Sequence, residues 1–298
     1  MILREPCLRG GWYPRERGAI EEFLEPIAKD SRNSTAFAQA AVAPHAGWYY
    51  SGFPAAMAVS SLDREAETVA VIGGHLPSGM PILLAEEEGV KTPLGTMRID
   101  QKLREEFKNQ ISSSRPDRYQ DNTVEVLLPM VHYFFPRAEL LWLRFPADIS
   151  SFEAGKLLAQ SAGRLGRRLA VLASTDLTHY GENYGFSPRG RGKPALEWVK
   201  KVNDAAFIAA VLDHDPSRAL KHAEEDFAAC SAGAVLGALG FAEALGINSR
   251  GKNSPGANTR EKTNARLLDY RTSADLGDEN EVPDSFVGYA AISFCLSL

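Results

Sequence analysis

Three short apolar runs constrain the fold of this chain more than any other feature of its sequence. Each has the length and the bounding residues of a buried strand: Ala38–Val42, Thr68–Ile72 and Leu169–Ala173. Each run is followed within six residues by a histidine, which is His45, His75 or His179. This spacing predicts three strands that each end in a turn carrying an imidazole.

The residues between each run and its histidine support these strand ends. Pro44 stops the first run, because proline cannot donate a hydrogen bond to a sheet ladder, and Gly73 and Gly74 follow the second run. The third run is followed by Asp176 as well as by its histidine. In open α/β sheets the ligand crevice lies outside the carboxyl ends of the strands, so we expect these side chains to gather there.

Helix-like and strand-like segments alternate along the rest of the chain. Helices are expected at Ala19–Lys29, Pro54–Leu62, Gln101–Asn109, from about Val124, at Ser150–Gly166 with Ser150 or Ser151 as the N-cap, and at Pro194–Leu245 with a break near Asp213–Pro216. Further strands are expected at Pro81–Ala85, Thr92–Ile99, Glu139–Arg144, Ala265–Arg271 and Phe286–Leu296, and Ser249–Lys262 is the most loop-like stretch. The alternation predicts a single three-layer α/β/α domain over residues 1–298, with a mixed central sheet.

Charge and hydropathy argue against several classes of protein. The net charge of −5 lacks the basic excess of a general nucleic-acid binder, so we expect no nucleic-acid partner. No apolar run reaches the roughly 18 residues of a membrane-spanning helix, so we expect no membrane partner. Glu5 and Pro6 stand where a signal peptide would have its apolar core, which favours a cytoplasmic protein. The cysteines Cys7, Cys230 and Cys295 are odd in number and far apart, as expected for thiols in a reducing compartment.

The same histidines are the best candidates for metal ligands, because a transition metal ion needs nitrogen, oxygen or sulfur donors that converge from different elements. His45, His75, Asp176 and His179 each follow an apolar run. Cys230 stands among small residues at the start of a predicted helix, and a helix N-terminus lowers the pKa of a thiol. The residues alone leave alternatives open, namely an inert core cysteine and histidines that make only structural hydrogen bonds.

Several short sequence motifs are spread along the chain from its start to its end. The most specific are Ala43–Gly52 and Ser174–Gly181; the weaker ones are Gly11–Pro14, Gly73–His75, Thr92–Gly95, Glu125–Pro129 and Val287–Ala291. This set resembles the signature of the Memo family, the mediator-of-cell-motility proteins. Prokaryotic members of that family are called AmmeMemoRadiSam system protein B.

The resemblance implies a fold similar to that of the LigB-type (class III) extradiol dioxygenases, which hold non-haem iron. Carried over to this sequence, it implies that His45, His75 and Cys230 are the metal ligands. It also implies that Asp176 and His179 are catalytic residues of the same pocket, with His179 as the acid–base histidine. The implied activity is that of a non-haem iron-dependent oxidoreductase or dioxygenase acting on a small molecule. Iron is the expected cofactor, and zinc or copper are the alternatives, because a thiolate also suits those metals.

This sequence departs from the family pattern at several points. Asn122 stands where a pocket histidine is expected, within Asp121-Asn122-Thr123 in place of Glu-His-Ser. His75 follows Gly74 without the usual proline, and Ser231 follows Cys230 in place of glycine. The alternatives to an oxidoreductase are a non-catalytic, pocketed binding protein of the AmmeMemoRadiSam system, with AMMECR-like and radical SAM proteins as partners, or a zinc hydrolase.

Overall fold

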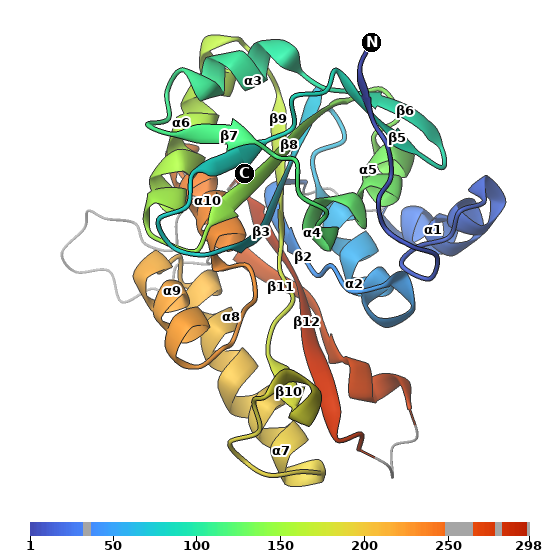
Figure 1. Cartoon of the computed structure of the whole chain (residues 1–298), viewed down its shortest axis with the longest axis vertical. Helices are drawn as coiled ribbons and strands as arrows, with labels where there is room; N and C mark the ends of the chain where they lie inside the picture. The colour runs from blue at the N-terminus through green and yellow to red at the C-terminus, as the bar shows by residue number, and fades with distance from the viewer. Residues whose placement is uncertain (32–36, 248–264, 278–281, 297–298) are drawn as a thin grey trace.

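The computed structural model describes residues 1–31, 37–247, 265–277 and 282–296 and shows an α/β fold with helices on both faces of a large mixed sheet (Figure 1). Over these described ranges the main sheet has nine strands, with the order β10-β12-β2-β9-β3-β8-β4-β7 and β11 paired to β12. Four parallel strands form its centre: β2 (Ala38–Ala43), β9 (Leu169–Ser174), β3 (Thr68–Leu76) and β8 (Glu139–Pro146). β2, β9 and β3 contain the three predicted apolar runs, and β8 contains the strand predicted at Glu139–Arg144, so the sheet brings the three runs together as expected.

Shorter or antiparallel strands complete the sheets. The outer strands of the main sheet are β12 (Ser285–Cys295), β11 (Ala265–Thr272), β10 (His179–Gly181), β4 (Ile82–Leu84) and β7 (Ser114–Pro116). A separate three-stranded sheet contains β1 (Leu3–Arg4), β5 (Gly89–Thr92) and β6 (Gly95–Arg98). β12 is antiparallel to β2, and β4 is antiparallel to β8, which makes the main sheet mixed.

Successive side chains of the central strands enter two different cores, as the alternation of a strand requires. In β3, Ala70 and Ile72 face the core beneath one helix layer, whereas Val69 and Val71 face the other core. The first layer contains α3 (Gln101–Lys108), α6 (Ser150–Arg164), α8 (Asp204–Leu212), α9 (Pro216–Glu225) and α10 (Ala232–Ala244). The second contains α1 (Arg17–Ser31), α2 (Trp48–Ser61), α4 (Asn122–Glu125) and α5 (Leu128–Phe134). α7 (Lys193–Trp198) lies beyond the layers, beside β10 (Figure 1).

Close backbone contacts with α6 and with β8 hold α10 in place. A Cβ atom on Gly155 of α6 would lie 2.0 Å from the carbonyl oxygen of Gly237, and one on Gly233 would lie 2.1 Å from the carbonyl oxygen of Pro146 at the end of β8. Only glycine allows such close approach. The first turn of α10, and the loop residue Cys230 just before it, is therefore held against the carboxyl edge of the sheet.

The predicted α/β class with a mixed sheet is confirmed, and some predicted boundaries are wrong. The helix expected from Pro54 begins at Trp48, because the Trp48 indole donates to the carbonyl of Val126 at 2.9 Å and its ring packs on Phe23. The strand expected to end at Ile72 continues to Leu76, so His75 lies within β3 rather than in a turn after it.

Two further helix predictions are wrong in part. Neither Ser150 nor Ser151 caps α6; its N-cap is Ile149, and the carboxylate of Asp148 accepts the Ser150 N–H at 3.0 Å. The helical segment expected to run from Pro194 to Leu245 breaks near Asp213–Pro216 as predicted, but it also breaks between α9 and α10. The predicted loop Ser249–Lys262 lies outside the described residues. Within the described ranges, no helix combines the length and apolar character that a membrane crossing requires.

Candidate metal centre

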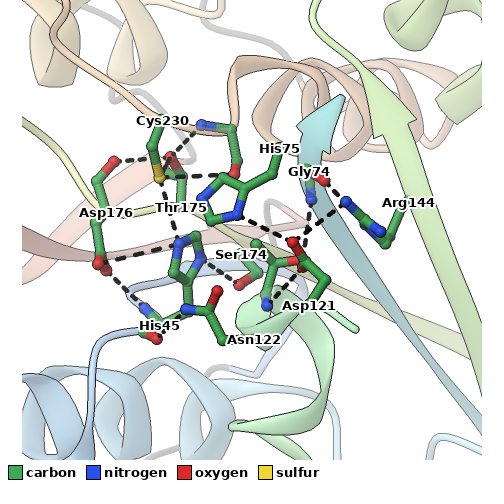
Figure 2. Close-up of polar contacts among 12 residues, drawn as sticks. His45, Gly74, His75, Asp121, Asn122, Arg144, Ser174, Thr175, Asp176 and Cys230 are labelled. Atoms are coloured by element: carbon green, nitrogen blue, oxygen red, sulfur yellow. Dashed lines mark hydrogen bonds and ion pairs between the residues drawn. The ribbon is translucent and has the colours of Figure 1, made fainter. Parts of the chain in front are cut away.

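His45 follows β2 and is fixed by groups that follow the neighbouring strand β9. Ala43 pairs with Ser174, so His45 and Asp176 each stand two residues past one matched pair of the parallel ladder. The His45 backbone N–H donates to Oδ1 of Asp176 at 2.7 Å, and Nδ1 of its ring lies 2.8 Å from Oγ of Ser174. His45 is only 1% exposed. These contacts point Nε2 of the ring away from Ser174 and toward Cys230 (Figure 2).

His75 belongs to the last residues of β3, where the backbone is unusual. Its φ is +56°, in the left-handed region that side chains rarely adopt. Its Nδ1 lies 3.1 Å from Oδ2 of Asp121, and the N–H of the preceding Gly74 donates to Oγ1 of Thr123 at 3.2 Å. With Nδ1 occupied by the carboxylate, Nε2 is the ring nitrogen left to bind a metal ion.

Cys230 completes the cluster from the loop before α10. Its Sγ lies 3.3 Å from Nε2 of His45, and its backbone N–H donates to the carbonyl of Asp176 at 3.2 Å. One ligand atom from each of His45, His75 and Cys230 lies within 4.8 Å of the others. The two imidazole rings are perpendicular, with centroids 5.0 Å apart. Two ring nitrogens and a sulfur that converge in this way fit a transition metal ion with an open coordination position.

The charges of the cluster also suit a cation. Burial alone would raise the pKa of the Cys230 thiol, but His45 and His75 outweigh burial and hold that pKa well below its usual value. Burial alone would lower the pKa of the His75 imidazole, but Asp121 and Cys230 outweigh burial and raise that pKa to about 10. The pKa of His45 is raised as well, because Asp176 and Cys230 together outweigh the effect of its burial. The cluster thus retains protons that a metal ion would displace on binding.

A pocket of about 540 Å³ opens in front of the cluster. Its described lining consists of Trp12, His45, Ala46, Gly47, Tyr50, His75, Asn122, Asp176, His179, Asn183, Tyr184, Ser273, Ser285, Val287 and Tyr289. His179 begins β10, and its Nδ1 lies 3.1 Å from the carbonyl oxygen of Leu177. A carbonyl only accepts, so Nδ1 carries the hydrogen and Nε2 is the nitrogen left for a ligand.

The structure brings together the residues singled out from the sequence, and it adds others that sequence reasoning missed. His45, His75, Asp176 and His179 line one pocket, and Cys230 lies behind it. The additions are Asp121 and Ser174, which hold the imidazoles, Trp12, which lines the pocket, and Arg144, which bonds Gly74 and Asp121 beside His75 (Figure 2). No local pattern marks these contacts, since Asp121 and His75 are 46 positions apart.

A buried carboxylate fixes the segment that leads to His179. Asp204, which is 0% exposed, accepts hydrogen bonds from the N–H of Thr178 at 3.1 Å, from the Thr178 hydroxyl and from the Tyr270 hydroxyl at 2.7 Å. Burial raises the pKa of Asp204 from its ordinary 3.8 to about 6, against the opposing effect of these hydrogen bonds.

We expect the free energy of unfolding to depend on pH through Asp204. The folded protein holds the carboxyl proton of Asp204 more tightly than the unfolded chain does. The resulting stabilisation of the fold is therefore fully present below pH 3.8 and is lost as the pH rises through about 6. Relative to an Asp204→Asn variant, the free energy of unfolding of the wild type should fall by about 2 kcal/mol between about pH 4.5 and about pH 7.5. Urea unfolding of both proteins across this range tests the expectation, and parallel pH profiles would contradict it.

Comparisons with known proteins point to one family. A profile described as Memo-like protein matches residues 4–293. A MEMO1 family protein of Pyrococcus abyssi is 30% identical, over 98% of this chain and 99% of its own length. Those of Pyrococcus horikoshii and Methanosarcina mazei are each 28% identical over the same shares. Among solved structures, an uncharacterized protein of Escherichia coli K12 has a TM-score of 0.45 and 13% identity, covering 84% of this chain and 98% of that one.

Proposed function

Because this chain belongs to the Memo family, we propose that it is a metal-binding protein that acts as a non-haem iron-dependent, dioxygenase-like oxidoreductase on a small molecule. The observation that carries the proposal is the convergence of His45, His75 and Cys230 at the wall of a pocket that also contains His179. A donor set of two imidazoles and one thiolate is a variant of the two-histidine, one-carboxylate site of iron oxygenases.

Each of these residues has a distinct task in the proposed site. His45 and His75 would hold the metal through Nε2, while Ser174 and Asp121 keep the opposite ring nitrogens occupied. Cys230 would bind as the thiolate that its lowered pKa favours. When bound, iron would supply redox chemistry with dioxygen at its open coordination positions.

His179 would serve the substrate side of the pocket, and Asp176 would support a metal ligand. His179 has Nε2 available and would take up or donate a proton at that atom. Asp176 is 3% exposed and holds the backbone of His45, so its task is to orient that ligand. The polar pocket residues Asn183, Ser273 and Ser285 would orient a small hydroxylated or amide-bearing molecule.

One observation favours a second candidate, a binding protein without turnover. Asn122 stands where the family resemblance expects a pocket histidine, and its Nδ2 donates to the carbonyl of His45 at 3.0 Å. That amide buttresses the metal ligand and offers no titratable group to a substrate. In this version, the pocket would capture a partner of the AmmeMemoRadiSam system, such as an AMMECR-like or radical SAM protein. For either function we propose the cytoplasm, a reducing compartment where Cys7, Cys230 and Cys295 would remain outside disulfide bonds, as they are in the structure.

Metal analysis of anaerobically purified protein, paired with measurement of dioxygen uptake, tests the proposal. We expect near-stoichiometric iron and an uptake that falls by roughly 100-fold in His179→Gln, the range typical of a lost general acid–base. His222→Gln is the matched control, because Nδ1 of His222 bonds Asp226, four residues further along the chain, and His222 does not line the pocket. Stoichiometric zinc without dioxygen uptake would contradict the proposal and favour a zinc hydrolase. Protein that contains no metal would favour the binding protein without turnover.

A further inference from the structure

We propose that Arg144 is a positioning residue that sets the geometry of the His75 ligand from within the sheet. The inference rests on the proposed metal site. Arg144 belongs to β8, pairs with Gly73 of the neighbouring β3 and is only 3% exposed. It does not line the pocket, so it acts on the site through other residues.

The guanidinium of Arg144 touches both groups that determine where His75 lies. Its Nε donates to the carbonyl of Gly74 at 2.9 Å, and its Nη2 lies 3.2 Å from Oδ2 of Asp121 (Figure 2). Gly74 is the residue before His75, and Oδ2 of Asp121 is the atom that bonds Nδ1 of His75. The planar guanidinium of Arg144 therefore holds both the backbone just before His75 and the carboxylate that bonds the His75 ring.

His75 needs such support because its backbone is strained and its surroundings are tight. The φ of +56° is unfavourable for histidine, so the conformation persists only where neighbouring bonds impose it. A Cβ on Gly74 would lie 2.4 Å from Cβ of Ser231, the residue that follows Cys230. A shift of the Gly74 carbonyl would thus disturb two of the three ligands together.

A purely structural role for Arg144 is the competing explanation, and the chain offers a control for it. Nη1 of Arg144 lies 3.4 Å from Oδ1 of Asp117, a buried carboxylate whose Oδ2 also accepts the indole N–H of Trp142 at 2.8 Å. Asp117→Asn weakens this buried network at a contact that involves neither Gly74 nor Asp121. It leaves the bonds of Arg144 to Gly74 and Asp121 in place.

The test uses Co²⁺ as the probe, because the absorption bands of cobalt report coordination geometry and thiolate ligation without any turnover. In Arg144→Lys, which keeps the charge but not the planar fork, we expect the Kd for Co²⁺ to rise by roughly 10–100-fold, with shifted d–d bands. In Asp117→Asn we expect a lower midpoint of urea unfolding, with Kd and bands as in the wild type. If Arg144→Lys does not fold, the double variant Arg144→Gln/Asp117→Asn, which removes one charge of each sign, is expected to show the same rise and shift.

The outcomes separate this inference from the proposed function. A wild type that binds no Co²⁺ would remove the metal site and the proposed function with it. A wild type that binds Co²⁺, together with arginine variants of unchanged Kd and spectrum, would overturn the role of Arg144 alone. The same role would be overturned if Asp117→Asn shifted the cobalt bands as much as Arg144→Lys does.

Discussion

Protein in which serine replaces Cys230 is expected to be purified without its metal ion. The substitution removes the only sulfur of the cluster, and a serine hydroxyl stays protonated where the thiol ionises under the influence of His45 and His75. Loss of an outer-shell partner costs roughly 10–100-fold in metal affinity, so loss of a direct ligand should cost more than about 100-fold. Metal content per chain and titration with Co²⁺ measure the effect.

The matched controls for this experiment are the other two cysteines. Cys295→Ser changes a thiol on β12 outside the cluster, and Cys7→Ser changes one whose pKa is raised to about 11 by burial and by Glu125. Both variants should retain the metal content of the wild type. If Cys230→Ser and His45→Ala also retained it, the ligand set described above would be incorrect.

Replacing Glu125 by alanine is expected to cause a large loss of stability. This carboxylate is 4% exposed, and four groups of the N-terminal segment donate to it. They are the N–H and thiol of Cys7, the N–H of Leu8 and the hydroxyl of Tyr13, at 2.8 to 3.0 Å. A buried donor left without a partner costs about 1–3 kcal/mol, so we expect a total loss of about 4 kcal/mol in the free energy of unfolding, measured by urea denaturation.

Glu125→Gln separates the role of the hydrogen bonds from that of the side chain's volume. Glutamine fills the same space and keeps one carbonyl oxygen, so it can satisfy part of the donors and should lose about half as much stability as alanine does. Equal losses in the two variants, or a loss below about 1 kcal/mol in Glu125→Ala, would show that the N-terminal segment is held by other contacts.

The central strands and the ends of β2 and β9 could be predicted from the sequence because their signals are local. An apolar run of five or six residues predicts a buried strand from its own composition, and Pro44 marks the end of the first strand. His45 and Asp176 were placed at one sheet edge by the general rule for parallel strands, and the register of the ladder then set them opposite one another.

The geometry around His75 could not be predicted, because long-range partners determine it. Gly73 and Gly74 look like a turn in the sequence, yet they extend β3 because small residues are needed where Thr123 and Ser231 pack against the strand. Arg144 follows an apolar run and gives no local sign that it bonds Gly74. The predicted helix start marked Cys230 as a candidate, but its choice as a metal ligand depended on family resemblance, since no spacing rule links a cysteine to a histidine 185 positions away.

The place of Trp12 in the pocket wall has a practical consequence for finding what the pocket binds. The carbonyl of Trp12 accepts the N–H of Trp48 at 2.8 Å, which seats the segment before α1 against the start of α2. Trp48 and Trp142 are buried in the core, and Trp198 packs beside Tyr180, away from the lining. Trp12 is thus a native fluorophore in the pocket wall, and changes in its emission would allow a compound library to be screened against the wild-type protein without any label or assumed reaction.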